Sequence, residues 1–200
     1  MEAASLGERG ASRVEGWAIV GWAAVGIALM TLAVFAVAGT GEDGMRMLLR
    51  ATARSSAVLF TAAFAASALH RRVRAGWTKW LLTNRRYVGV SFAVSHLVHL
   101  GAIVGLARTA PAVHYAATTV VLGGFGFLLV AAMTATSFDA TAAWIGRRAW
   151  RALHTFGVHY LWFVFFATSA PKVTSEVAAV PLTALLLAAM VLRLLPSRRA

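Results

Sequence analysis

Histidine is the residue type in this chain with the most chemistry to offer. The 200 residues include six histidines, no cysteine and only seven acidic residues. Without cysteine the chain has no disulfide, no thiolate metal site, no iron–sulfur cluster and no covalent haem attachment through a CxxCH motif. A metal or cofactor must therefore be held by histidine, methionine or carboxylate.

Four of the histidines lie inside two apolar segments. His96 and His99 are in SHLVHL, and His154 and His159 are in LHTFGVHY. Ionisable side chains are rare inside membrane helices and usually mark a functional site. A single histidine could simply bond a neighbouring helix, but four in two segments favour ligation. Haem iron takes two axial imidazoles from facing helices, whereas zinc more often brings thiolates or carboxylates as well.

The spacing of these histidines leaves their pairing open. His96 and His99 are three residues apart and share a helix face. His154 and His159 are about 140° apart around a helix, so they do not both face one haem. Counted from the basic residues that open each segment, His96 matches His159 in depth, and His154 is shallow, near the level of His70. His70 is therefore a further, weaker ligand candidate.

The segments that position these histidines are long and apolar. Hydrophobic residues make up 60% of the chain and charged residues 13%, against about 45–50% and about 25% in soluble domains. We expect an all-α integral membrane protein, a bundle of six transmembrane helices formed by residues 17–195, with tails at 1–16 and 196–200. The expected helices are 17–39, 47–70, 87–107, 112–134, 152–170 and 177–195.

The basic residues predict the orientation. The net charge is +12, but it lies in short loops between apolar segments, so we expect no nucleic-acid partner. With both termini cytoplasmic, 14 of the 19 basic residues fall on the inner side, which agrees with the positive-inside rule. Val73, Trp77, Trp80 and Leu81 recur at helical spacing among basic residues and predict a short amphipathic helix on the inner surface.

Two arginines near the outer end of the second helix have two interpretations. Arg50 and Arg54 are four residues apart and share one face. They either extend to the outer headgroups, which is the plainer interpretation, or bind haem propionates or an anionic or quinone substrate.

Two stretches resemble a known family. NRRYVGVSFAVSHLVHL at 84–100 resembles the opening of the third helix of ferric reductase-like transmembrane domains, and RRAWRALHTFGVHYLW at 147–162 resembles the start of their fifth helix. GMRMLLRAT and LLVAAMTATS fit the second and fourth helices in order. Over about residues 40–170 the chain is most similar to the haem-binding membrane subunits of bacterial methionine-sulfoxide reductase systems.

The resemblance implies b-type haem held by histidines of the third and fifth helices, and electron transfer across the bacterial inner membrane. It assigns His99 and His154 as ligands. The family's second histidine in the fifth helix falls on Ala167 here. The number of haems, one or two, is therefore left open. His96 or His159 could take the place of the missing second ligand.

The expected function is a haem b membrane subunit, a component of a redox system and not a self-contained enzyme. With no flavin domain of its own, it needs quinol or a partner flavoprotein as donor, and an external acceptor protein. Two alternatives remain: a small histidine-dependent transporter or channel, and a structural membrane subunit without cofactor.

Overall fold

The computed structural model describes residues 14–112 and 116–196, and this part of the chain is helical throughout, with no strand. Its helices are α1 (Trp17–Ala38), α2 (Glu42–Arg72), α3 (Gly76–Thr83), α4 (Arg85–Thr109), α5 (Ala117–Ala135), α6 (Asp139–Ser169) and α7 (Ala179–Leu194), with a 3-10 turn at Ala170–Thr174 between α6 and α7.

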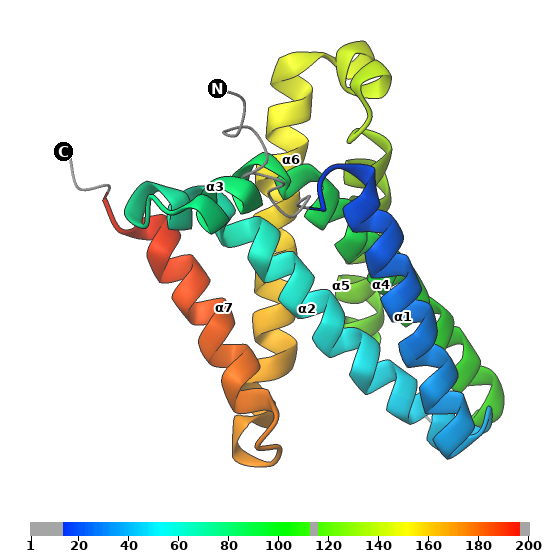
Figure 1. Cartoon of the computed structure of the whole chain (residues 1–200). Coiled ribbons are helices and arrows are strands. Elements are labelled where there is room, and N and C mark those ends of the chain that lie inside the picture. Colours follow the sequence, from blue (N-terminus) through cyan, green and yellow to red (C-terminus); the bar gives the residue numbers. More distant parts are fainter. Residues whose placement is uncertain (1–13, 113–115, 197–200) are drawn as a thin grey trace, which may run out of the picture.

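The six longer helices run alternately up and down the bundle (Figure 1). α1 begins and α7 ends at the same side, which we call the termini side, and α3 lies across it. The opposite side carries the α1–α2 connection and the 3-10 turn, and we call it the loop side.

Four helices are long and apolar enough to cross a membrane, namely α1, α2, α4 and α5, so this is a membrane protein. α7 is apolar but has 16 residues, shorter than the roughly 20 that span a bilayer without local thinning. α6 has 31 residues, but its first half is rich in arginine.

Each expected helix has a counterpart, with three starts displaced. α2 begins at Glu42 instead of 47, α5 at Ala117 instead of 112, and α6 at Asp139 instead of 152. Hydropathy marks only the apolar part of a helix, and the polar first turns of α2 and α6 lie outside it. Gly146, at φ 77°, makes a kink in α6 directly before its arginine-rich stretch at 147–151.

The short helix expected after α2 is present as α3. It covers Gly76–Thr83, while Val73 caps the end of α2. Buried Asn84 joins α3 to α4, and its side-chain oxygen accepts from the Gly16 N–H at 3.0 Å. Trp80 donates to the Val14 carbonyl at 3.0 Å. These bonds fix the start of α1 against the α3–α4 corner.

Small and hydroxyl side chains bring α2 and α4 together in the largest interface of the bundle. Ser55 and Ser56 both contact the Ser95 hydroxyl, at 2.8 and 2.9 Å. Small residues let membrane helices approach closely, and interhelical hydrogen bonds hold them there. α2 and α4 therefore form the rigid base from which His96 and His99 project.

One apolar core joins five helices. It comprises Phe60, Phe64 and Ala65 of α2, Phe92 of α4, Val130 and Met133 of α5, Leu161 of α6, and Leu186 and Ala189 of α7. α1 is attached more lightly, with only Ile27 and Val34 buried.

Candidate haem-ligand site

His96 and His99 lie side by side on α4, as their spacing predicts. Their ring centroids are 5.4 Å apart and the rings are nearly parallel, at 15°. Phe127 of α5 covers both, with centroids 4.4 Å from His96 and 6.5 Å from His99. Parallel neighbours on one helix do not coordinate the same iron from opposite sides, so a haem bound by either histidine would need its second axial ligand from another helix.

A threonine fixes the protonation of His99. Buried Thr52 of α2 lies 2.9 Å from His99 Nδ1 and donates its one hydroxyl hydrogen to the Leu48 carbonyl at 2.7 Å. With that hydrogen on the Leu48 carbonyl, the Thr52 oxygen is an acceptor for His99, which favours the tautomer that carries the proton on Nδ1. This leaves the lone pair on Nε2, and metal-bound histidines are held by a partner on the other nitrogen in the same way.

His159 has the same arrangement within α6. Its Nδ1 lies 2.7 Å from the Thr155 carbonyl, which only accepts, so Nδ1 carries the proton. Within the described residues Nε2 has no hydrogen-bond partner. The ring lies edge-on to Phe64, 5.7 Å between centroids.

Counted along their helices, His99 and His159 are equally far from the helix ends. Each is ten residues before the last residue of its helix, Thr109 for α4 and Ser169 for α6. At 1.5 Å per residue both are about 15 Å from the loop side. Counting from Arg151 matches His159 with His96 instead. The contacts with α2 separate the two histidines of the first count, because His99 bonds Thr52 whereas His159 packs on Phe64, about 18 Å further along that helix.

Aromatic side chains fill the space between α4 and α6. No Cα atom of one helix lies within 8 Å of the other. Phe165 of α6 bridges the gap, with its centroid 5.8 Å from His96 and 6.0 Å from Phe92. Phe60 packs on Phe165 at 5.3 Å. Aromatic rings thus occupy the region between the two histidine helices.

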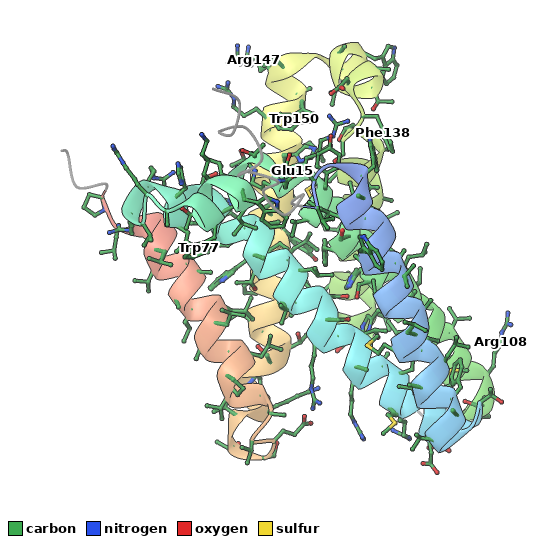
Figure 2. The ribbon with its side chains drawn as sticks, viewed as in Figure 1. Glu15, Trp77, Arg108, Phe138, Arg147 and Trp150 are labelled. Carbon is green, nitrogen blue, oxygen red and sulfur yellow. The ribbon has the colours of Figure 1, made fainter. Side chains whose placement is uncertain are left out.

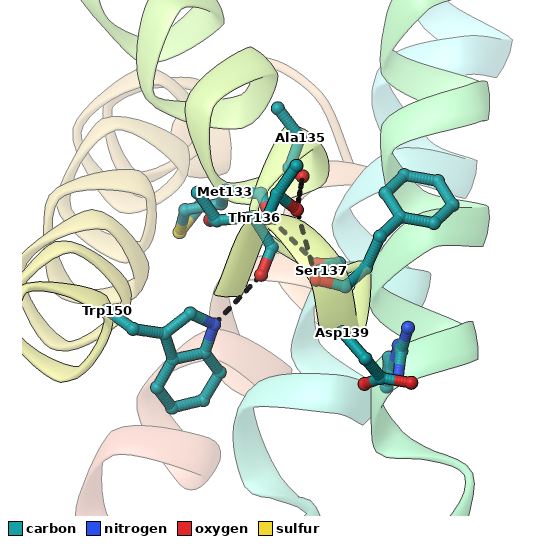
Figure 3. A network of polar contacts seen from close by, with 9 residues as sticks. Met133, Ala135, Thr136, Ser137, Asp139 and Trp150 are labelled. Atoms are coloured by element: carbon teal, nitrogen blue, oxygen red, sulfur yellow. Dashed lines mark hydrogen bonds and ion pairs between the residues drawn. The ribbon is translucent and has the colours of Figure 1, made fainter. Parts of the chain in front are cut away.

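His154 lies nearer the termini side and is bonded differently. Thr136 donates to the Ala132 carbonyl at 2.8 Å and so accepts from His154 Nε2 at 3.1 Å. The His154 ring stacks on Trp150, 4.3 Å between centroids. Figure 3 shows the Trp150 indole directed at Thr136, whose carbonyl accepts its N–H at 2.9 Å. His154 therefore offers Nδ1, not Nε2.

The remaining candidates are apart from these groups. His70 donates through Nδ1 to Thr78 of α3 at 2.9 Å, because the Thr78 hydrogen goes to the Val73 carbonyl. Arg50 and Arg54 are exposed and make no hydrogen bond or ion pair within the described residues. His114 lies outside those residues.

The donor groups that this site offers are single histidine nitrogens. The described residues contain no group of three or more His, Asp or Glu that could hold a metal ion. Haem needs only two axial groups, because the macrocycle supplies the others. His96 Nδ1 is buried without a hydrogen-bond partner in the described part of the chain, an unsatisfied group beside the phenylalanine-filled space.

Sequence spacing identified the histidines but not the threonines that orient them. Thr52, Thr78 and Thr136 are 47, 8 and 18 residues from their histidines. Only the Thr155–His159 bond, four residues apart, follows from helical periodicity.

Comparisons of the chain with protein-family models, with curated proteins and with solved structures found no match.

Proposed function

We propose that this chain is a ferric reductase-like haem b subunit of the bacterial inner membrane that carries electrons from a quinol or flavoprotein donor to an external acceptor. In this proposal α6 and α7 also cross the bilayer, which gives six spans with both termini cytoplasmic. The family assignment rests on the resemblance of residues 84–100 and 147–162.

The observation that supports it most is the matching state of His99 and His159. Both have Nδ1 beside an oxygen that can accept its hydrogen and no described hydrogen-bond partner on Nε2, and they lie on the two helices that flank the ring-filled space. We therefore favour His99 and His159 as the axial pair. This differs from the His99–His154 assignment that the family pattern implies, because His154 Nε2 is bonded to Thr136.

Bound haem would supply one-electron redox chemistry at iron. The protein would hold the haem and shield it from water. Thr52 and the Thr155 carbonyl fix the two imidazole rings, and the rings of Phe60, Phe92 and Phe165 exclude water from the space between α4 and α6. Those rings must rotate outward when the space is filled.

The orientation follows from the charges. The termini side carries the basic residues of α3, of the start of α4 and of the first half of α6. Cytoplasmic loops of membrane proteins have this excess of arginine and lysine. The donor would therefore bind at the termini side and the acceptor at the loop side.

Electron transfer across a bilayer tests the function directly. Purified protein is inserted into vesicles that contain ferricyanide, and a membrane-soluble quinol is added outside with its autoxidation suppressed. We expect ferricyanide reduction well above that of empty vesicles, and a loss of that excess in His99→Ala and His159→Ala. His70→Ala is the matched control, because His70 bonds Thr78 outside the α4–α6 space. Wild-type rates equal to empty vesicles would contradict the proposal.

A further inference from the structure

A second feature of the termini side is a cavity of about 470 Å³ between α2, α4, α5, α6 and α7. This volume is within the range of pockets that bind small molecules. Its mouth is basic, with Arg85 and Arg86 at the start of α4, Arg151 of α6 and Arg193 near the end of α7. His154 is the one histidine of the described residues that lines it.

The charges around this cavity are unbalanced. Asp139 is the one acidic residue in its lining, and it pairs with Arg86 at 2.7 Å. Arg151 makes no hydrogen bond or ion pair within the described residues. Arg86 Nε is buried, and it too lacks a hydrogen-bond partner in the described part of the chain. Four guanidinium groups thus face one cavity with a single counter-ion.

Two of the arginines are held in place by neutral groups. Arg193 donates to the Phe64 carbonyl at 2.8 Å, with its guanidinium 4.3 Å from the centre of the Phe64 ring. Arg85 donates to the Ser67 hydroxyl at 2.7 Å. Neutral acceptors orient a guanidinium without cancelling its charge, so the positive charge remains available to a ligand.

The floor of the cavity is apolar. It is formed by Phe60, Phe64, Phe92, Val130, Met133 and Leu161. A ligand that matches both the basic mouth and the apolar floor of this cavity has an anionic head and an apolar body. Arginine clusters bind phosphate by short, charge-assisted hydrogen bonds, and basic pockets between membrane helices on the cytoplasmic side bind anionic lipid headgroups.

We propose that this cavity binds an anionic phospholipid, with the headgroup phosphate among Arg85, Arg86, Arg151 and Arg193 and the start of one acyl chain against Phe64 and Met133. A haem propionate has similar head chemistry. It is the weaker candidate, because His154 is the one histidine present and its Nε2 is already bonded to Thr136. The lipid would join α4, α6 and α7, which meet here through few direct contacts.

Lipid retention tests this assignment. Wild-type protein is washed in a delipidating detergent and its lipids are measured by native mass spectrometry. We expect about one anionic phospholipid per chain. Arg151→Gln alone and with Arg193→Gln should lower its retention roughly tenfold or more, since each removes a charge-assisted contact. Arg151 makes no hydrogen bond or ion pair with the residues that the structure describes, so the single variant keeps the test valid if Arg193→Gln does not fold.

Two arginines outside the cavity are matched controls. Arg147 lies on the termini side, one turn of α6 before Arg151, and does not line the cavity, whereas Arg108 lies at the far end of α4 (Figure 2). Arg147→Gln and Arg108→Gln should retain lipid as the wild type does. If they lose it equally, binding is general surface attraction and the proposal is wrong.

Three further results would also overturn it. If the wild-type protein retained no lipid, the cavity would not be a specific lipid-binding site. Displacement of the lipid by millimolar inorganic phosphate would assign a free-anion site instead. If the protein holds no lipid and the Arg151 and Arg193 variants absorb less at the haem bands than the wild type, the cavity would hold haem propionates. Because the absorption spectrum is recorded on the same samples, failure of the lipid proposal is distinguishable from failure of the haem proposal.

Discussion

At the scale of the residue, a hydroxyl group determines which nitrogen of a membrane histidine can bind a ligand. Thr52, Thr78 and Thr136 each lie within hydrogen-bond distance of a backbone carbonyl that can take their one hydrogen, and this favours His99, His70 and His154 as the donors to them. The free nitrogen is Nε2 for His99 but Nδ1 for His154. This difference, more than depth, separates the two as haem ligands.

Thr52→Val should weaken haem binding without disturbing the bundle. Valine has nearly the shape of threonine but no acceptor, so His99 Nδ1–H loses its partner and the ring is no longer held. Loss of such an outer partner lowers metal affinity by about 10- to 100-fold. The haem-to-protein ratio and the midpoint potential measure it.

Two threonine controls accompany this variant. Thr52→Ser keeps the hydroxyl oxygen that accepts from His99, so the haem-to-protein ratio and the midpoint potential should equal those of the wild type. Thr61→Val removes a buried hydroxyl that bonds only the Ala57 carbonyl of its own helix, and it should leave haem binding unchanged. An equal loss in Thr52→Val and Thr61→Val would show that the effect is general packing.

At the scale of the element, the connection between α1 and α2 depends on one glycine. A Cβ on Gly44 would lie 1.7 Å from the Gly39 carbonyl oxygen and 2.8 Å from its carbon. These are backbone atoms with no rotamer to change. Gly39 itself has φ 70°, which an L side chain rarely adopts. The first turn of α2 can therefore lie directly on the end of α1.

Gly44→Ala should destabilise the protein by about 1–3 kcal/mol, because either α1 or α2 must shift to admit the methyl group. Its thermal unfolding midpoint in detergent, followed by circular dichroism, should fall by several degrees, at about 2–4 °C per kcal/mol. Gly41→Ala is the control, since its Cβ would meet nothing within 4 Å. Equal midpoints for the two variants would contradict this account of the α1–α2 connection.

The helices could be predicted from sequence more fully than the site. Apolar length predicted six segments and the amphipathic spacing predicted α3. The start of α6 at Asp139 was missed because the kink at Gly146 and the arginines that follow it separate this start from the apolar part of the helix. The faces of His96 and His99 follow from a spacing of three. Their partners could not be predicted, since Thr52 and Phe127 reach them only through packing of separate helices.

At the scale of the whole molecule, the number of crossings decides which side each loop faces. α1, α2, α4 and α5 have the length and composition of spans. If α6 and α7 also cross, the 3-10 turn between them is outside. If they do not, that turn lies on the same side as the end of α7.

Cysteine labelling distinguishes these topologies, and the chain has no native cysteine to interfere. We expect Ser175→Cys to react with a membrane-impermeant maleimide in intact cells. Thr83→Cys and Pro196→Cys should react only after the membrane is opened, because six spans place them inside. A protected Ser175→Cys would mean four spans and would remove the transmembrane path that the proposed function needs.

The central claim is that His99 and His159 hold one haem, and optical spectroscopy tests it most directly. The dithionite-reduced minus oxidised spectrum and the haem content are measured on purified wild type, His99→Ala, His159→Ala, His154→Ala and His70→Ala. We predict sharp low-spin α and Soret bands that are lost in the first two variants and retained in the last two. A wild type that stays colourless when expressed with ample haem would contradict the claim, as would bands that survive without His99 or His159.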